Sequence, residues 1–192
     1  MTEESPATAR RPVLQVVVAS TRPGRVGEPV ARWITARAEE HAAFDVEVVD
    51  LAEIDLPIFA EPRHPRLGEY ALEHTRRFSA IIDRADGFVF VFPEYNHSYN
   101  AALKNALDHL NREWAGKPVG LVSYGGVAGG ARAAVALEPV LVALKMRPVA
   151  FAPIPFVAQF IEDEGGERRF VPDAEVEKGI IALLDVLSAE LG

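Results

Sequence analysis

The sequence predicts an α/β fold in which a parallel β-sheet lies between two layers of helices. Short runs rich in β-branched and aromatic residues alternate with segments whose apolar residues recur every three or four positions. The short runs lack the apolar–polar alternation of half-exposed strands, which indicates strands covered on both faces. The length of 192 residues fits one domain with a substantial core.

Five strands and five helices follow from these patterns. The expected strands are Val13–Ala19, Asp45–Asp50, Gly87–Phe92, Val119–Ser123 and Pro148–Ala152. The expected helices carry apolar stripes at Val30, Trp33 and Ile34; Thr75, Phe78 and Ile82; Leu103, Ala106, Leu107 and Leu110; Leu137, Val140, Leu141 and Leu144; and Val176, Ile180, Leu183, Leu184, Leu187 and Leu191. With right-handed crossovers, this count favours a three-layer sandwich whose five parallel strands have the order 2-1-3-4-5.

Two connections carry structural signals of their own. Leu56–Pro65 contains three prolines and no periodicity, which predicts a stiff surface loop, with a lid or a subunit contact as its alternative role. Asp163–Glu167 is typical of a hairpin turn between short extended segments at Phe156–Ile161 and Arg168–Val171.

Composition excludes several classes of function. The formal net charge of −8 disfavours nucleic acid and anionic membranes as partners, since no basic patch stands out. The chain has no cysteine, which rules out disulfides, iron–sulfur ligation and zinc–thiolate sites. No metal site is expected either, because metal-ligand spacing is lacking among His41, His64, His74, His97 and His109. Any redox chemistry then calls for an organic cofactor.

Residues 12–192 are expected to form a single domain. Residues 1–11 are expected to be a disordered tail, because they offer almost nothing to bury. No apolar segment of a secretory signal follows Arg10 and Arg11, and no apolar run approaches the ~20 residues of a membrane span. These features predict a cytoplasmic protein that binds small molecules.

The loop after the first strand has the composition of a phosphate site. Its hydroxyl and cationic donors are Ser20, Thr21, Arg22 and Arg25. Gly24 and Gly27 permit close backbone approach at the start of a helix, where the helix dipole favours an anion. The loop lacks the Gly-Lys-Ser/Thr ending of nucleotide-hydrolysing P-loops, and it is no dinucleotide fingerprint. The alternative interpretation is an ordinary strand-to-helix turn with solvated arginines. Glu28 is expected to turn outward.

The loop after the third strand offers a flat contact surface. Pro93 fixes the turn, Tyr95 provides a ring for a flat heterocycle, and Asn96 and Ser98 provide hydrogen bonds. Glu94 has the spacing of a general base, but a packing or subunit-contact role is favoured because nothing nearby marks a proton to abstract. In the helix that follows, we expect Lys104, Asn105 and Asp108 to tie the helix to the loop.

The loop after the fourth strand, Ser123–Gly130, contains four glycines. Glycine lets main-chain amides approach the edge of a ring system, and amides near the pyrimidine carbonyls of a flavin stabilise its reduced form. His97 is interpreted as a rim residue, since no positioned serine and aspartate accompany it. Together, the three loops suggest one ligand with an anionic end and a flat, hydrogen-bonding end.

The three motifs resemble the NADPH-dependent FMN reductase-like family in their order and spacing between Val13 and Ala152. They are Ser-Thr-Arg-Pro-Gly-Arg at 20–25, Pro-Glu-Tyr-Asn at 93–96 with Ala-Leu-Lys-Asn-Ala-Leu-Asp at 102–108, and Ser-Tyr-Gly-Gly at 123–126 with Gly-Gly-Ala-Arg-Ala at 129–133. The resemblance implies a flavodoxin-like fold, non-covalent FMN, and dimers or tetramers. It also implies reduction of flavins, quinones, azo compounds or metal oxyanions with NAD(P)H.

Carried over residue by residue, the resemblance assigns the cofactor site to three groups. The FMN phosphate would be held by Ser20, Arg22, Arg25 and the amides of Val26 and Gly27. The ribityl chain and ring would be lined by Pro93, Glu94, Tyr95, Asn96 and Ser98, with Ser123, Tyr124, Gly125 and Gly126 along the other edge. Two departures are visible: Asn100-Ala101 stands where the family commonly has Pro-Gly, and Ala19 where Gly is frequent.

These features predict an NAD(P)H-dependent FMN oxidoreductase. Hydride would pass from nicotinamide to bound FMN and on to a flavin, quinone, azo or similar acceptor. The flavin supplies the chemistry, so no catalytic side chain is assigned. A non-enzymatic FMN electron carrier of flavodoxin type is the alternative, and a flavin-free binding or regulatory module is a third class.

Overall fold

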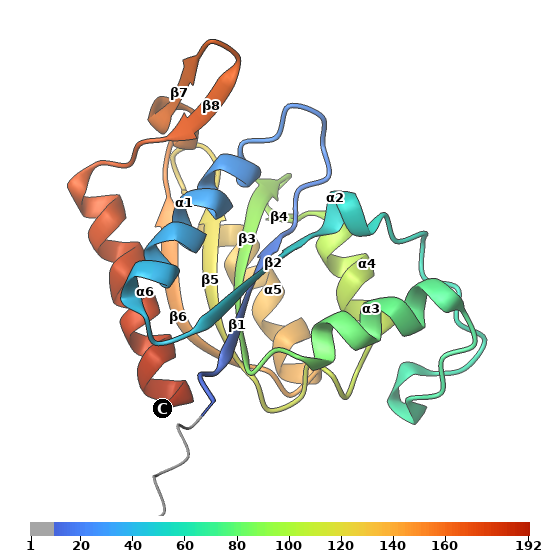
Figure 1. Ribbon diagram of the computed structural model, residues 1–192. Coiled ribbons are helices and arrows are strands. Elements are labelled where there is room, and N and C mark those ends of the chain that lie inside the picture. The colour runs from blue at the N-terminus through green and yellow to red at the C-terminus, as the bar shows by residue number, and fades with distance from the viewer. Residues whose placement is uncertain (1–9) are drawn as a thin grey trace, which may run out of the picture.

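The computed structural model describes residues 10–192, so residues 1–9 of the predicted tail lie outside the described residues. Helices, strands and two short 3-10 helices (η) alternate along the chain (Figure 1). In chain order they are β1 (Val13–Val18), α1 (Gly27–His41), β2 (Asp45–Asp50), α2 (Leu51–Ile54), η1 (Pro65–Leu67), α3 (Glu73–Asp83), β3 (Gly87–Tyr95), β4 (Ser98–Tyr99), α4 (Ala101–His109), β5 (Pro118–Tyr124), α5 (Ala131–Ala143), β6 (Arg147–Ile154), η2 (Val157–Phe160), β7 (Ile161–Glu164), β8 (Glu167–Phe170) and α6 (Ala174–Leu191).

The central sheet has the order β2-β1-β3-β5-β6, with parallel pairing at each step. Counted as parallel strands alone, this is the predicted order 2-1-3-4-5, and the α/β flavodoxin-like fold class is confirmed. Three strands are longer than predicted: β3 continues to Tyr95, β5 to Tyr124 and β6 to Ile154.

The extra strand, β4, was not predicted. It pairs antiparallel with the end of β3, placing Tyr95 opposite Ser98. The turn between them is Asn96-His97, with φ angles of 50° and 66°. A two-residue hairpin turn of this kind needs positive φ at both central positions, which asparagine tolerates. The pairing prolongs β3 past Pro93 and fixes Tyr95 at the edge of the sheet.

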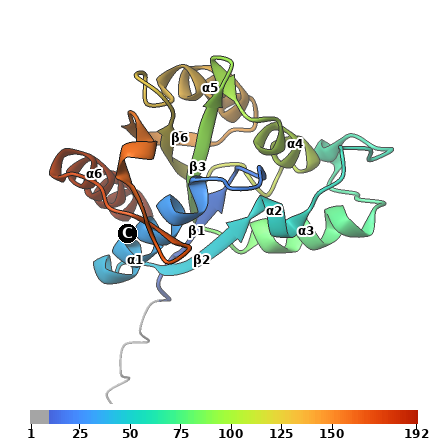
Figure 2. The ribbon, with the colours of Figure 1, turned by 90° about the horizontal axis from the view of Figure 1, so that it is seen from above.

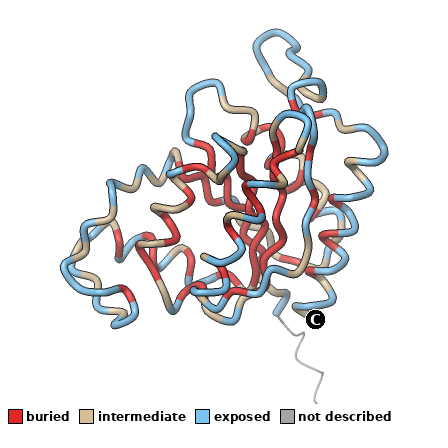
Figure 3. Tube along the Cα trace, turned by 180° about the vertical axis from the view of Figure 1, so that it is seen from behind, coloured by how far each residue is buried: buried red, intermediate tan, exposed pale blue. Residues whose placement is uncertain are grey.

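Helices cover both faces of the sheet (Figure 2). One face packs against α1 and α6, and the other against α3, α4 and α5. Successive strand residues point to opposite faces. On β3, Phe88, Phe90 and Phe92 therefore enter one core while Val89 and Val91 enter the other, and all five are fully buried. Burial is concentrated in these central strands (Figure 3). This double burial explains the uninterrupted apolar run in the sequence.

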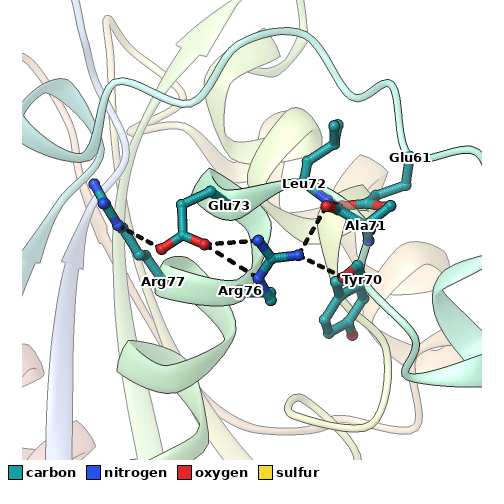
Figure 4. A network of polar contacts seen from close by, with 7 residues as sticks. All are labelled: Glu61, Tyr70, Ala71, Leu72, Glu73, Arg76 and Arg77. Carbon is teal, nitrogen blue, oxygen red and sulfur yellow. Dashed lines mark hydrogen bonds and ion pairs between the residues drawn. The ribbon is translucent and has the colours of Figure 1, made fainter.

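The proline-rich loop between α2 and α3 is fixed by polar contacts. The Glu61 carboxylate accepts hydrogen bonds from the Ala71 and Leu72 N–H groups at 2.8 and 3.1 Å. Arg76 donates to the carbonyls of Tyr70 and Ala71 at 3.1 and 2.7 Å, and it also pairs with Glu73 (Figure 4). The segment is thereby joined to the start of α3.

The other end of this loop is held by α4. The Asn105 side chain accepts from the Phe59 N–H and donates to the Pro57 carbonyl, both at 2.9 Å. Lys104 and Asp108 form an ion pair at 2.5 Å on the same helix. The expectation that these residues tie the helix to a loop is confirmed for Asn105, although the loop is the proline-rich one.

His109, on α4, is fully buried and donates from Nδ1 to the Asn105 carbonyl at 2.7 Å. Burial lowers the pKa of this imidazole below its usual value. As pH falls, the unfolded chain therefore binds the proton first, so stability is lost below the unfolded-state pKa of about 6.5. We expect His109 to lower the unfolding free energy as the pH falls from 7.5 to 5.5.

Urea unfolding at the two pH values measures this loss. The change in unfolding free energy should shrink in His109→Gln, which has no titrating ring. Equal pH dependence in wild type and His109→Gln would contradict the prediction.

The C-terminal part differs from the prediction in detail. The predicted hairpin is confirmed. The prediction that its first extended segment begins at residue 156 is wrong, because residues 157–160 form η2 and the first hairpin strand begins at Ile161. The last helix begins at Ala174, where the Asp173 side chain accepts a hydrogen bond from the Val176 N–H. Among residues 10–192, no helix combines the length and the apolar character needed to cross a membrane.

Candidate functional site

The three predicted loops meet at the carboxyl edge of the sheet and enclose a pocket of about 230 Å³. It is lined by Ser20, Arg22, Arg25, Val26, Pro93, Glu94, Tyr95, Tyr124, Gly125, Val157 and Ala158. Their strands β1, β3 and β5 are neighbours in the sheet, so segments far apart in the sequence converge here. The predicted site residues that do not line the pocket are Gly27, Asn96, Ser98, Ser123 and Gly126.

Arg25 is engaged within the protein. Its guanidinium forms a two-point ion pair with Asp50, at the end of β2, and donates to the Ser20 carbonyl at 2.8 Å. Asp50 also accepts from the Ala52 N–H, so one carboxylate holds the first loop and caps α2. Arg25, which the sequence assigns to a phosphate, therefore braces the loop and also lines the pocket.

Arg22 is the free cation of the pocket. Its side chain forms no ion pair or hydrogen bond within the described chain, and it lines the pocket together with Ser20. Ser20 is almost fully buried, with its hydroxyl 3.5 Å from the Tyr95 hydroxyl. Glu28 points away and pairs with Arg32, as predicted. The positive end of the loop is therefore open to an anion.

The start of α1 provides the second feature of an anion site. No side chain caps the helix, and the first N–H groups of a helix have no partner within it. Gly27 lies directly beneath Tyr124: a Cβ at Gly27 would come within 2.5 Å of the Tyr124 hydroxyl oxygen. Gly27 thus lets the tyrosine reach the helix start, although it does not line the pocket itself.

Tyr124 brings an unused donor to the same point. The residue is 4% exposed, and its hydroxyl has no hydrogen-bond partner among residues 10–192. Burial raises the pKa of the hydroxyl, which keeps it neutral and able to donate. A buried unpaired hydroxyl costs about 1–3 kcal/mol, and a ligand oxygen would satisfy it. The sequence assigns Tyr124 to a ring edge, and the structure places its hydroxyl beside Gly27 at the start of α1.

Glu94 has a structural partner. Arg132, in the first turn of α5, donates to its carboxylate from the side chain at 2.6 Å and from the backbone N–H at 3.2 Å. The Glu94 side chain is only 10% exposed. The carboxylate therefore joins β3 to α5 across the pocket wall, in line with the packing role favoured from the sequence over that of a general base.

The glycine-rich loop is shaped by buried contacts. Ser123 donates from its hydroxyl to the Gly129 carbonyl at 2.9 Å. Gly130 has a φ of 84°, and a Cβ there would lie 2.6 Å from the Ser123 Cβ. The carbonyls of Gly125 and Gly126 accept from the N–H groups of Val157 and Phe156. Ser123 and Gly126 thus shape the loop rather than line the pocket.

The first departure from the family pattern has a structural role. Asn100, just before α4, donates from its buried side-chain amide to the Ala19 carbonyl at 2.7 Å. Ala19 is buried, and its N–H donates to the Val91 carbonyl. Asn100 therefore links the loop after β3 to the end of β1, a link that proline cannot make.

Size alone does not select this pocket. Larger hollows of about 340, 450 and 460 Å³ lie beside α2, beneath the proline-rich loop, and between α1 and β8. Each contains residues of at most one of the three loops. The smaller pocket joins all three, and it alone of these combines Arg22 with the unpartnered Tyr124 hydroxyl.

Sequence reasoning missed two kinds of contributor. Val157 and Ala158 line the pocket from η2, whose backbone docks on the glycine-rich loop. Asp50 and Arg168 hold the first loop without lining the pocket. Asp50 forms an ion pair with Arg25, and Arg168 donates hydrogen bonds to the carbonyls of Gly24 and Arg25. An acidic residue ending the neighbouring strand was a signal for Asp50, but nothing local marked Arg168.

Comparison with known proteins identifies relatives of this architecture. The family model described as NADPH-dependent FMN reductase matches residues 13–154. An NAD(P)H-dependent FMN reductase of Schizosaccharomyces pombe is 45% identical over 138 residues, which cover 71% of this chain and 68% of the relative. A quinone reductase of Pseudomonas putida is 35% identical over 159 residues, covering 78% of this chain and 81% of the relative.

A solved structure agrees with these sequence relatives. FerB, a flavoenzyme NAD(P)H:(acceptor) oxidoreductase from Paracoccus denitrificans, has a TM-score of 0.73 and 25% identity, and the match covers 93% of this chain and 96% of that chain. The family model spans all three motif loops and most of the pocket lining. The resemblance seen in the sequence is therefore confirmed, and the chain belongs to the NADPH-dependent FMN reductase family.

Proposed function

We propose that the pocket between the three loops holds the FMN of this NAD(P)H-dependent FMN oxidoreductase, with the phosphate against Arg22 and the start of α1. One observation carries the placement: the free Arg22 side chain, the uncapped start of α1 and the unpartnered Tyr124 hydroxyl all meet at this pocket. A cation, backbone N–H groups and a neutral hydroxyl are the donors that a phosphate dianion uses. The residues present fit the cofactor that the family binds.

At the phosphate end we assign direct contacts to Ser20, Arg22, Tyr124 and the Val26 and Gly27 amides. Arg25 is assigned the bracing role, because its guanidinium already binds Asp50 and the Ser20 carbonyl. Glycine at position 27 keeps the helix start accessible to the tyrosine.

At the other end we assign the ring to the surface formed by Pro93, Tyr95 and Gly125. Tyr95 is 41% exposed at the pocket, so its ring offers a contact face. FMN held there would supply the hydride chemistry by which NAD(P)H reduces an acceptor. The protein contributes orientation and exclusion of water, and Glu94 is held in its ion pair with Arg132. Asn96 and Ser98 support the ring contact through the β3–β4 turn.

The acceptor is proposed to be a small organic molecule of the quinone or azo class. Relatives named as a quinone reductase and an FMN-dependent NADPH-azoreductase support this class. We further propose a cytoplasmic homodimer or homotetramer. The exposed Tyr95 ring at the pocket and the exposed Val127 side chain of the glycine-rich loop would then be covered by a second subunit.

Stopped-flow mixing tests the activity against the electron-carrier alternative. FMN-loaded protein is mixed anaerobically with NADPH or NADH, and the flavin absorbance is followed. Direct bleaching that obeys saturation kinetics is expected, followed by reoxidation on adding a quinone. No bleaching without a partner reductase would overturn the enzymatic function.

Arg22→Ala is expected to weaken FMN binding by about 1.5–3 kcal/mol, because a charge-assisted hydrogen bond to phosphate is lost. Fluorescence titration of apoprotein gives the dissociation constant. Riboflavin, which lacks the phosphate, should bind wild type and variant alike. Arg66→Ala is the matched control, since Arg66 is exposed on the proline-rich loop and does not line this pocket. An unchanged FMN dissociation constant in Arg22→Ala would remove Arg22 from the site.

A further inference from the structure

The β7–β8 hairpin reaches the phosphate loop from outside. Arg168, on β8, donates from one guanidinium nitrogen to the Gly24 carbonyl at 2.8 Å and from another to the Arg25 carbonyl at 3.0 Å. These contacts join residues more than 140 positions apart in the sequence. The hairpin lies beyond residues 13–154, where the family model matches. Its contact with the loop is thus an addition to the matched part of the chain.

Strand periodicity directs Arg168 toward the loop. Alternate residues of a strand face the same side, so Arg168 and Phe170 share one face of β8 while Arg169 faces the other. Phe170 is 5% exposed and packs edge-on against Trp33 of α1, with ring centroids 5.8 Å apart. Arg169 is exposed and pairs with Glu164 of the same hairpin. The buried phenylalanine therefore anchors the hairpin, and it places the arginine two residues earlier against the loop.

A second link fixes the hairpin to the start of α1. Arg32 pairs with Glu28 on its own helix and with Glu167 of the hairpin, the latter at 3.4 Å. The three side chains are exposed, so this link contributes little stability by itself.

The Arg168 contacts constrain the peptide groups that a phosphate would meet. In a trans peptide the carbonyl and the following N–H point in opposite directions. Because Arg168 binds the Arg25 carbonyl, the Val26 N–H of the same peptide is turned away from the hairpin. Val26 lines the pocket, and its N–H has no acceptor among residues 10–192. The hydrogen bond from Arg168 to the Arg25 carbonyl therefore orients the Val26 N–H.

We propose that Arg168 is a positioning residue, which holds the Gly24–Val26 backbone in the conformation that binds the FMN phosphate. Arg25 and Asp50 brace the loop from the β2 side, and Arg168 braces it from the hairpin side. The guanidinium suits this task because its planar fork can reach two carbonyls at once. The inference rests on the proposed placement of FMN in the pocket.

The test compares flavin binding by Arg168→Ala and by its neighbour Arg169→Ala, which removes an equal charge from the opposite face of β8. Fluorescence titration of apoprotein should show FMN bound about ten- to a hundredfold more weakly by Arg168→Ala, with little change for riboflavin. Arg169→Ala should bind both flavins like wild type. Arg168→Lys should be intermediate, because an ammonium keeps the charge without the planar fork.

Hydrogen exchange of the apoproteins gives a readout that is independent of flavin. Faster exchange at residues 20–27 is expected in Arg168→Ala, with the strands β1 and β3 unchanged. Equal FMN affinity and equal exchange in Arg168→Ala and wild type would overturn the positioning role while leaving the proposed function standing. Failure of wild type to bind FMN would overturn the proposed function instead. Equal weakening of FMN and riboflavin would also overturn the positioning role, because it indicates general damage to the fold.

Discussion

Asp50→Ala is expected to lower the unfolding free energy by about 3–5 kcal/mol, because it leaves Arg25 without its partner in a poorly solvated position. The side chains of Arg25 and Asp50 are only 16% and 9% exposed. The change also removes the acceptor for the Ala52 N–H at the start of α2. FMN affinity should fall as well, since the first loop loses its inner brace. Urea unfolding and flavin titration measure the two effects.

Asp45→Ala is the matched control at the opposite end of the same strand. Asp45 pairs with Arg11 in an exposed ion pair, with side chains 47% and 57% exposed. Its loss should cost less than about 1 kcal/mol. Replacing both partners, in Asp50→Leu with Arg25→Met, should restore much of the stability but leave FMN binding weak. Similar stability losses at Asp50 and Asp45 would show that burial does not govern the pair.

Gly130→Ala is the second change with a large expected effect, a destabilisation of about 2–5 kcal/mol. The left-handed φ of 84° disfavours any side chain, and the new Cβ would meet the Ser123 Cβ at 2.6 Å and the Tyr124 backbone nitrogen at 2.8 Å. Relief requires a shift of β5 or of the glycine-rich loop. Because Tyr124 lies in the pocket, FMN binding should weaken together with stability.

Gly126→Ala provides the comparison for Gly130→Ala. It lies in the same loop, has no positive φ, and its Cβ would meet no atom within 4 Å. Thermal unfolding should place this variant close to wild type, whereas Gly130→Ala should unfold many degrees lower. A tolerated alanine at position 130 would mean that the loop can rearrange at little cost.

The fold was predictable because its signals are local. Phe88 and Val89 point to opposite faces of the sheet and are both buried, so β3 appears in the sequence as one apolar run. The positions of the loops follow from the strand ends, which is why the three motifs converge as expected. The β4 strand was missed because two residues carry no periodicity, and its turn signal was only Asn96.

The electrostatic partners of the site could not be predicted in the same way. Composition identifies Arg22 and Arg25 as candidate phosphate ligands equally well, yet Arg25 is bound to Asp50 while Arg22 is free. The choice depends on which strand lies beside β1, and therefore on tertiary structure. Arg168 could be predicted even less, because it reaches the loop through tertiary contacts such as the docking of Phe170 on Trp33.

Several residues that brace the three loops lie outside the pocket lining. Asp50, Arg132 and Arg168 hold the loops through ion pairs and main-chain contacts, while side chains such as Val127 are exposed on the loop surface outside the pocket lining. With FMN placed as proposed, descendants of such a chain are expected to exchange these exposed side chains, and so change which oxidant they accept, without disturbing the residues that hold the coenzyme. That separation offers a physical route by which one ancestral scaffold diversifies.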